Sequence, residues 1–475
     1  MIRLTWVQPE DLIGHELQQA ELEGRCVTSV RARWLAAGGH PAPPTAGASP
    51  GPVPARLRAL AEQLLDELTP PPAPPGAVAR GDLGPRRPYR VADLRGRLHA
   101  AWLGRAAGCL LGKPVEKLPL AGIRRLAAAT GNWPLTTWFT ERGVPPELRE
   151  AYPWNRRSAA TSLAENIDGM PEDDDLNYPL LNLLLLRRHG KSFTTADVAR
   201  LWLDELPAGR TFTAERVAYR NLLHGLEPPH TATRHNPFRE WIGALIRADV
   251  HGWTNPGAPG AAAEQARRDA ALTHTDNGVY GAMFVAATIA EAAAGDTDVH
   301  HCLRAGLASV PPDCRLAGAV RLGIQLAEDT REFDDVVDRL HATYATHHWV
   351  HVVPNAALVA AALTHADGDF TGSITRAVSG GWDTDSNGAT AGSVAGLLAG
   401  HPDRLPERWT APLKNRLATS VGDFNGIGFD TLAEFTTELA EITTDLATTA
   451  PATTVATAAT AATAATAATW EAYRP

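Results

Sequence analysis

The stretch Ser379–Gly400 reads SGGWDTDSNGATAGSVAGLLAG. Small residues (Gly, Ala, Ser and Thr) dominate after Asp385, which predicts a helix near 387–399 that packs against its neighbours at short distance. Ahead of this helix, Gly380 and Gly381 allow the backbone to come close to a ligand.

A second helix with small residues is predicted near 97–111, within RLHAAWLGRAAGCLLGKPVE (Arg97–Glu116). Three of its glycines recur every four residues: Gly104, Gly108 and Gly112. This spacing makes a flat face that another helix can approach. Pro114 ends the helix, so Glu116 follows in a loop. Close packing explains the glycines but does not explain this carboxylate.

From about Val91 to Ala447, apolar residues recur at helical spacing, and alternating strand patterns are almost absent. Helices are predicted near 97–111, 159–167, 176–188, 195–205, 213–224, 237–248, 262–271, 277–294, 298–308, 314–328, 332–346, 354–364, 371–378, 387–399 and 430–446. The pattern therefore predicts a compact, multi-helix all-α domain.

Three regions are predicted along the chain: an N-terminal appendage with Pro-rich linkers (1–90), an all-α catalytic domain (91–447) and an Ala/Thr-rich low-complexity tail (448–475). The appendage contains helical pieces within residues 1–38 and at Ala55–Leu68, and we expect it to pack on the catalytic domain or on a partner. The tail has no apolar face, which favours a disordered or weakly helical state.

The composition excludes several classes of protein. The 475 residues include 53 Asp and Glu against 44 Lys and Arg, and this formal charge of -9 disfavours a nucleic-acid partner. No run of about 18 apolar residues predicts a membrane span, and the first residues lack the apolar core of a signal peptide. The four cysteines lie far apart without a CxxC pair. Together these features predict a cytoplasmic protein and leave its oligomeric state open.

The densest acidic cluster, MPEDDDLNYPLL, places four adjacent carboxylates before a predicted helix: Glu172, Asp173, Asp174 and Asp175. Adjacent carboxylates raise one another's pKa unless cations are present, and a hard divalent ion is the usual remedy. Carboxylates at a helix N-terminus also cap free N–H groups. The cluster alone therefore indicates either a metal site or a richly capped helix.

A second acidic element follows Gly380 and Gly381. Asp383, Asp385 and the Ser386 hydroxyl offer the oxygen ligands that Mg²⁺ or Mn²⁺ prefers. The alternative is a Gly-Gly turn followed by a capping aspartate. A further motif, THTDNG, places His274 before a helix expected at 277–294. A histidine in that position is more often a cap or a surface residue than a catalytic one.

Taken together and in this order, GCLLGKPVE, EDDDLNY, THTDNGVYGAMF and GGWDTDSNGATAGSVAG resemble the ADP-ribosylglycohydrolase family, over about residues 95–400. The resemblance implies an all-α fold with a cleft that holds two divalent cations, Mg²⁺ or Mn²⁺. It implies metal ligation by Asp173, Asp174, Asp175, Asp383, Asp385 and Ser386. Glu116 matches a loop glutamate near the metals. The candidates for proton transfer, unranked, are Glu116, Asp174 and Asp383.

The resemblance also implies that His274 helps to line the ADP-ribose cleft, and Gly381 and Trp382, next to Asp383, are expected to contact the substrate. The chain departs from the family pattern at four positions: Asp173 and Leu176 replace threonines, Trp382 replaces a glycine and Ser386 replaces a threonine. The added charge of Asp173 suits a two-cation site. An indole at Trp382 either stacks on a planar group and narrows the cleft or fills core space.

Three functions agree with these observations. The first is a metal-dependent hydrolase that cleaves the N-ribosyl bond of a free or protein-linked ADP-ribose conjugate. The second keeps this chemistry on a small N-riboside or a metabolite derived from NAD, as Trp382 and Asp173 suggest. The third is a non-catalytic protein of the same fold that binds ADP-ribose or has a structural role.

Overall fold

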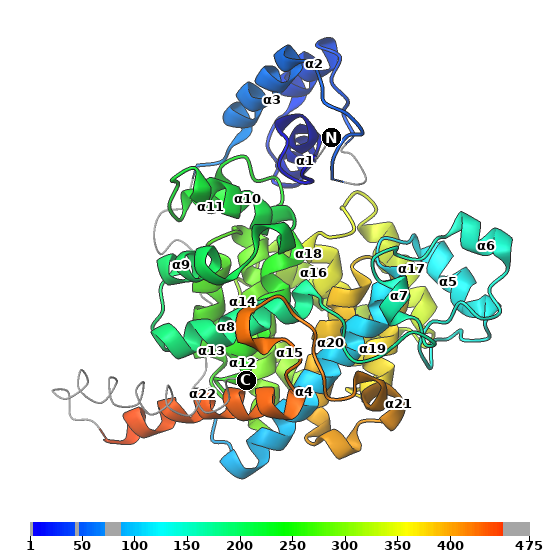
Figure 1. The fold of residues 1–475 in the computed structure, drawn as a ribbon, viewed down its shortest axis with the longest axis vertical. Coiled ribbons are helices and arrows are strands. Elements are labelled where there is room, and N and C mark those ends of the chain that lie inside the picture. The colour runs from blue at the N-terminus through cyan, green and yellow to red at the C-terminus, as the bar shows by residue number, and fades with distance from the viewer. Residues whose placement is uncertain (1–2, 43–46, 72–86, 450–475) are drawn as a thin grey trace.

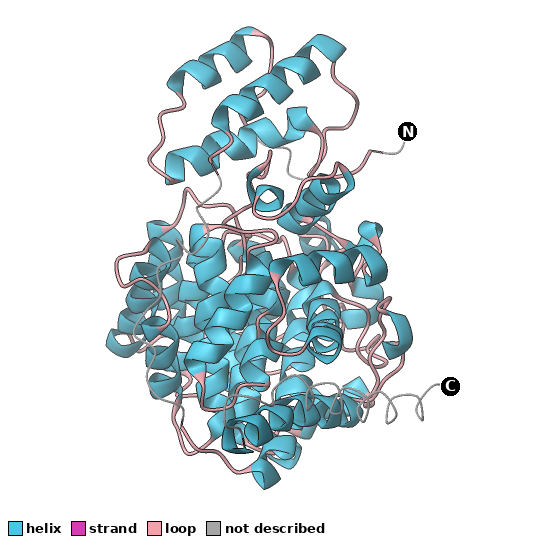
Figure 2. Ribbon diagram, turned by 90° about the vertical axis from the view of Figure 1, so that its left-hand side faces the viewer, coloured by secondary structure: helices cyan, strands magenta, loops and turns pink. Residues whose placement is uncertain are grey.

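The computed structural model describes residues 3–42, 47–71 and 87–449, and within these ranges the chain is helical and forms no strand (Figure 2). Isolated β-bridges join single residues, such as Trp241 and His351. The predicted all-α class is confirmed. No helix in the described ranges combines the length and the apolarity that crossing a bilayer requires. Nearly all of the predicted tail, 448–475, lies outside the described residues.

Three N-terminal helices lie at one end of the molecule in Figure 1: α1 (Pro9–Leu22), α2 (Thr28–Ala36) and α3 (Ala55–Leu68). The bounds of α3 are the predicted ones. Apolar residues on these helices, such as Leu12 and Leu64, are fully buried. Helices α1, α2 and α3 are therefore packed against other parts of the described chain.

The other described α-helices are α4 (Val91–Gly112), α5 (Leu120–Ala129), α6 (Pro146–Ala151), α7 (Ala159–Ser162), α8 (Asp174–His189), α9 (Thr195–Glu205), α10 (Thr213–Leu223), α11 (His230–Thr233), α12 (Asp249–Trp253), α13 (Pro259–Ala270), α14 (Asp276–Ala294), α15 (Val299–Ala308), α16 (Arg315–Asp329), α17 (Phe333–Thr343), α18 (Val352–His365), α19 (Phe370–Ser379), α20 (Thr384–Ala399), α21 (Glu407–Thr410) and α22 (Phe429–Thr449). Short 3-10 helices are η1 (Lys113–Val115), η2 (Ala208–Arg210), η3 (Ile242–Arg247), η4 (Pro402–Arg404), η5 (Ala411–Leu413) and η6 (Gly422–Phe424).

Helices α4 and α20 pack directly on each other through glycine. A Cβ atom added at Gly104 would overlap the carbonyl of Gly392, and one added at Gly108 would overlap the carbonyl of Gly388. The reverse also holds, because a Cβ at Gly388 or Gly392 would meet the facing carbonyl on α4. The close packing that was predicted for each helix is confirmed, and the two helices are each other's partners.

Two predicted helices are wrong in extent. The helix expected at 237–248 is the 3-10 helix η3 (Ile242–Arg247), because Trp241 is extended and the Ile242 N–H donates to the Val350 carbonyl at 2.9 Å. The helix expected at 159–167 stops at Ser162, because Leu163 is extended and the Ala164 N–H bonds to Phe139 instead. Helices α5 and α6 were not predicted.

The glycine contact leads to a stability prediction. Gly108→Ala should lower the free energy of unfolding by about 3 kcal/mol, because the added methyl group meets backbone that cannot rotate away. Gly318→Ala is the matched control: it also lies within a helix, α16, but no atom stands within 4 Å of its added Cβ. This control should be neutral or stabilise by about 0.5–1 kcal/mol. Chemical denaturation of both variants measures the difference, and equal midpoints would contradict the role of the contact.

Candidate active site

A cavity of about 470 Å³ lies where the C-terminal end of α4 meets the N-terminal ends of α8 and α20. Its wall contains many acidic and hydroxyl side chains: Glu116, Ser158, Thr161, Glu172, Asp173, Asp174, Asp175, Thr213, Glu215, Asp383, Asp385 and Ser386. Two acidic motifs that lie far apart in the sequence therefore share one cavity with Glu116. All the residues predicted to act as metal ligands or in proton transfer are among these.

The N-terminus of α20 is fixed by its contact with the end of α4. The Thr384 hydroxyl donates to the Gly112 carbonyl at 2.8 Å, and a Cβ at Gly112 would overlap the backbone of Thr384. On the other side, Asn355 of α18 accepts from the Asp383 N–H at 3.2 Å and from the Asn387 amide at 2.7 Å. These bonds hold Asp383 and Asp385, both less than a tenth exposed, at the cavity wall.

The N-terminus of α8 is fixed by buried cations. Asp173 caps the helix, since its Oδ1 accepts from the Asp175 N–H at 2.9 Å. The Lys113 ammonium forms an ion pair with Asp173. Arg105, fully buried on α4, pairs with Asp175 at 3.1 Å and with Asp249 at 2.9 Å. Two of the three aspartates in the run therefore have a protein cation as partner.

Glu116, Asp383 and Asp385 form a group in which one carboxylate oxygen from each residue lies within 4.8 Å of the others. Glu116 accepts a hydrogen bond from the Asn155 amide at 2.6 Å and pairs with Lys117 at 3.0 Å. Asp383 and Asp385 have no ion pair with any residue in the described ranges. Three carboxylates this close and this poorly neutralised are a suitable set of hard oxygen ligands for a divalent cation.

Without a cation, the cavity opposes ionisation of several carboxyl groups. Burial, together with the charges of Asp385 and Glu116, raises the pKa of Asp383 well above its usual value. Burial, together with Asp173 and Asp385, does the same to the pKa of Asp174. Burial and the Glu116 charge raise the pKa of Asp385 to about 7. A divalent cation bound to these groups would restore their charged forms, because an adjacent positive charge favours the carboxylate.

The pKa values of Asp173 and Asp174 move in opposite directions. Burial alone would raise the pKa of Asp173, but the Lys113 ammonium more than offsets this and holds the pKa below its usual value. Asp174 has no such partner and remains partly exposed in the cavity wall. The negative charge of Asp173, which replaces a threonine of the resembled pattern, is therefore balanced by the positive charge of Lys113.

The chain is similar to known proteins. Residues 90–451, about three quarters of the chain, match the ADP-ribosylglycohydrolase family. The chain belongs to the ADP-ribosylglycohydrolase family. An uncharacterized protein of Archaeoglobus fulgidus is 25% identical over 315 residues, which cover 66% of this chain and 90% of the relative. A chain of a solved ADP-ribosylglycohydrolase-related protein complex is 19% identical and aligns with a TM-score of 0.44, covering 74% of this chain and 98% of that one.

Membership of the ADP-ribosylglycohydrolase family indicates a hydrolase of the glycohydrolase type. The family match begins at residue 90. Helices α1, α2 and α3 therefore lie outside it, although the cavity wall includes Trp6 from the segment before α1.

The three predicted substrate-binding residues are not among the residues that line the cavity, although His274 lies 3.9 Å from Glu215, which does line it. The side chain of His274 is fully buried and lies 2.6 Å from the Thr273 hydroxyl. Trp382 stacks on His341, with ring centroids 4.1 Å apart. Gly381 has a left-handed φ of 77°, and the side chains that a Cβ added there would meet are those of α5 and α17. Of the two roles considered for Trp382, its surroundings favour core packing.

Several residues at the site escaped the sequence analysis: Lys113, Asn155, Asn355, Arg105 and Trp6. Lys113 had a usable signal, because it lies three residues before Glu116 at the end of a glycine-rich helix. The two asparagines had none, since they come from segments that only the tertiary structure brings to the cavity.

The pKa of Asp385 predicts a pH dependence. The folded protein without metal holds this proton up to about pH 7, whereas the usual pKa is 3.8, so folding loses stability as the pH rises through that window. If Mn²⁺ is bound by the carboxylates of this cavity, it requires their ionised forms, so its stabilising effect should grow over the same window and its binding should release protons. Thermal unfolding with chelator and with Mn²⁺, between about pH 5 and 8, tests this. Asp385→Asn should reduce the trend without abolishing it, because the pKa values of Asp174 and Asp383 are raised as well. A Mn²⁺ effect independent of pH would contradict the prediction.

The Lys113 ion pair predicts a second effect. Lys113→Met leaves Asp173 buried without its cation, which should cost about 3 kcal/mol in the metal-free protein. The Mn²⁺-induced rise in melting temperature should then be larger than in the parent protein. Lys414→Met, which breaks a surface pair with Asp168, is the control and should change neither quantity measurably. An unchanged metal-free stability in Lys113→Met would disprove the buried pair.

Proposed function

We propose that the protein is a divalent-metal-dependent hydrolase that cleaves the N-glycosidic bond of an ADP-ribose conjugate. The observation that carries the proposal is the cluster of Glu116, Asp383 and Asp385, with Asp174 in the same cavity and, within the described ranges, no cation of the protein paired with Asp174, Asp383 or Asp385. Membership of the ADP-ribosylglycohydrolase family supports glycoside hydrolysis as the reaction.

The residues present suit a metal site. Asp174, Asp383, Asp385 and Ser386 would supply carboxylate and hydroxyl oxygens, and the raised pKa values of the aspartates are relieved by positive charge. Asp173 contributes less, because Lys113 already neutralises it. Asp175 pairs with Arg105, yet burial and the neighbouring carboxylates still raise its pKa well above the usual value. When bound, Mg²⁺ or Mn²⁺ would act as a Lewis acid that orients ribose hydroxyls and lowers the pKa of water.

The carboxylates supply the remaining chemistry. Cleavage of an N-ribosyl bond passes through a state in which positive charge develops at the anomeric carbon, and a strongly acidic cavity stabilises such charge. Glu116 is our candidate for moving the proton, because Asn155 and Lys117 hold its carboxylate at the cavity wall. Asp383 and Asp174 are the other candidates.

The acceptor group of the conjugate is open. The small-substrate alternative rested in part on Trp382, whose indole packs on His341 and so gives no support for a narrowed cleft. No observation at the cavity favours a loss of catalysis, because every predicted ligand lines it.

The test is hydrolysis of a panel: ADP-ribosyl-arginine, ADP-ribosyl-serine, nicotinamide mononucleotide and simple N-ribosides, each with Mg²⁺ or Mn²⁺ and with chelator. We expect chelator-sensitive release of ADP-ribose from ADP-ribosyl-arginine, which is N-linked, measured by mass spectrometry. Release from ADP-ribosyl-serine alone would move the reaction to an O-glycosidic bond. Asp383→Asn should lower kcat/KM by at least about 100-fold, while Asp403→Asn, an exposed residue, should match the parent protein. Release of ribose or ribose phosphate from the small compounds alone would move the substrate to a metabolite, and turnover unaffected by chelator would refute the metal requirement.

A further inference from the structure

The N-terminal segment contributes to the wall of the active-site cavity although it lies outside the family match. Trp6 lines the same cavity as Asp383 and Asp385, while the match begins at residue 90. Nothing in the acidic motifs requires this contribution. The cavity of this chain is therefore built from the family's helices together with a segment of its own.

The position of Trp6 is strongly constrained. Its backbone has a left-handed φ of 67°, its N–H donates to the Gly47 carbonyl at 2.6 Å, and a Cβ at Gly47 would overlap the indole. The indole meets Phe238 and Trp241 edge to face, with centroids 5.5 and 5.9 Å away. Only 8% of Trp6 is exposed, so most of its indole is packed in the core and only a small part can face the cavity that it lines. A side chain held in a rarely adopted backbone conformation by packing on several sides is a fixed part of the wall.

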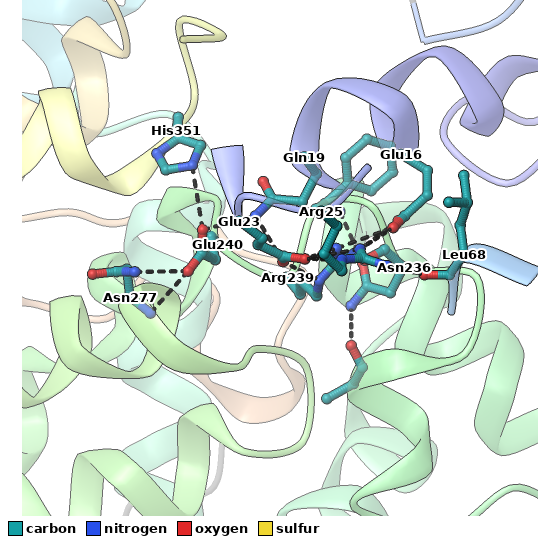
Figure 3. A network of polar contacts seen from close by, with 12 residues as sticks. Glu16, Gln19, Glu23, Arg25, Leu68, Asn236, Arg239, Glu240, Asn277 and His351 are labelled. Carbon is teal, nitrogen blue, oxygen red and sulfur yellow. Dashed lines mark hydrogen bonds and ion pairs between the residues drawn. The ribbon is translucent and has the colours of Figure 1, made fainter. Parts of the chain in front are cut away.

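A buried ionic network fastens the segment to the rest of the protein (Figure 3). Arg239, almost fully buried, bonds to Glu16 at 2.7 Å and to Glu23 at 2.7 Å, both on or just after α1. Gln19 donates to Glu240 at 2.7 Å. Breaking a buried ion pair of this kind leaves an unpaired charge in the protein interior, which is strongly destabilising. The N-terminal helices are therefore a stable part of the folded protein.

Trp6 belongs to an apolar and aromatic part of the cavity wall, whose other members are Phe212, Ile242, Ile246, Trp349 and Val350. Four basic side chains line the same cavity: Lys113, Lys117, Arg157 and Arg210. Arg210 forms an ion pair with Glu172 at 3.0 Å, and the two lysines pair with Asp173 and Glu116. Arg216 connects Phe212 with the residue before Trp6. Its guanidinium lies 5.4 Å from the Phe212 ring and donates to the Thr5 hydroxyl at 2.7 Å. Aromatic faces bind planar rings, and guanidinium groups bind phosphates.

We propose that Trp6 contacts the planar ring of a nucleotide-type substrate, so that the N-terminal segment completes the active site and sets its specificity. This rests on the proposed function. In this arrangement the carboxylates bind the ribose whose glycosidic bond is cleaved. The aromatic residues bind the remote planar ring, and the arginines bind the phosphates.

The experiment measures binding of ADP-ribose in the presence of Mn²⁺, and of Mn²⁺ alone, by calorimetry on the full chain. Trp6→Leu removes the ring but keeps an apolar side chain, and it should weaken ADP-ribose binding about tenfold. Trp6→Phe should bind within about threefold of the parent protein, because it restores an aromatic face. Mn²⁺ affinity should be unchanged in both. Trp34→Phe, a substitution in α2 away from the cavity, is the control for disturbance of the segment.

Three results would overturn the inference: no ADP-ribose binding by the parent protein, an ADP-ribose affinity unchanged in Trp6→Leu, or a parallel loss of Mn²⁺ affinity that marks a packing role. Failure of the proposed function has a different signature. In that case no conjugate is hydrolysed, yet ADP-ribose still binds and still depends on the ring at Trp6.

Discussion

Helices α4 and α20 approach so closely that backbone carbonyls of each stand where a side chain of the other would begin. Only glycine at Gly104, Gly108 and Gly112 permits this approach. The contact has a chemical consequence, because it ends at the active-site cavity. Helix α4 ends at Gly112, and the Thr384 hydroxyl donates a hydrogen bond to the Gly112 carbonyl. This contact places Asp383 and Asp385 beside Glu116. Packing of two backbones thus sets the spacing of three carboxylates.

The charges around the cavity divide into a structural group and a chemical group. Arg105 and Lys113, both on or next to α4, pair with Asp175 and Asp173 and fix the start of α8. Lys113 holds the pKa of Asp173 below its usual value, whereas burial keeps the pKa of Asp175 raised although Arg105 opposes the shift. Asp174, Asp383 and Asp385 have no ion pair with a cation in the described part of the chain, and burial raises the pKa of each. The same helix therefore stabilises one set of carboxylates and leaves the other set in need of a cation.

The His274 motif has a structural role in this arrangement. Asn277, three residues later at the start of α14, donates its amide to Glu240 at 2.7 Å and accepts from the Leu316 N–H at 2.9 Å. Glu240 also accepts a hydrogen bond from the Gln19 amide on α1 (Figure 3). The motif thus supports the segment that carries Ile242 and Gly243 to the cavity wall, and it links the N-terminal helices to the family fold.

Local patterns in the sequence were enough to predict the all-α class, the glycine-lined helices and the acidic residues, because helical periodicity, glycine spacing and runs of carboxylates are visible within a short window. They also placed the ends of α3 and α20 within a few residues. Tertiary contacts select which helices meet, which aspartates find Arg105 or Lys113, and that His274 and Trp382 do not line the cavity. The same contacts bring Trp6 to the site. These outcomes depend on residues that lie far apart along the chain, for which a single sequence carries no local signal.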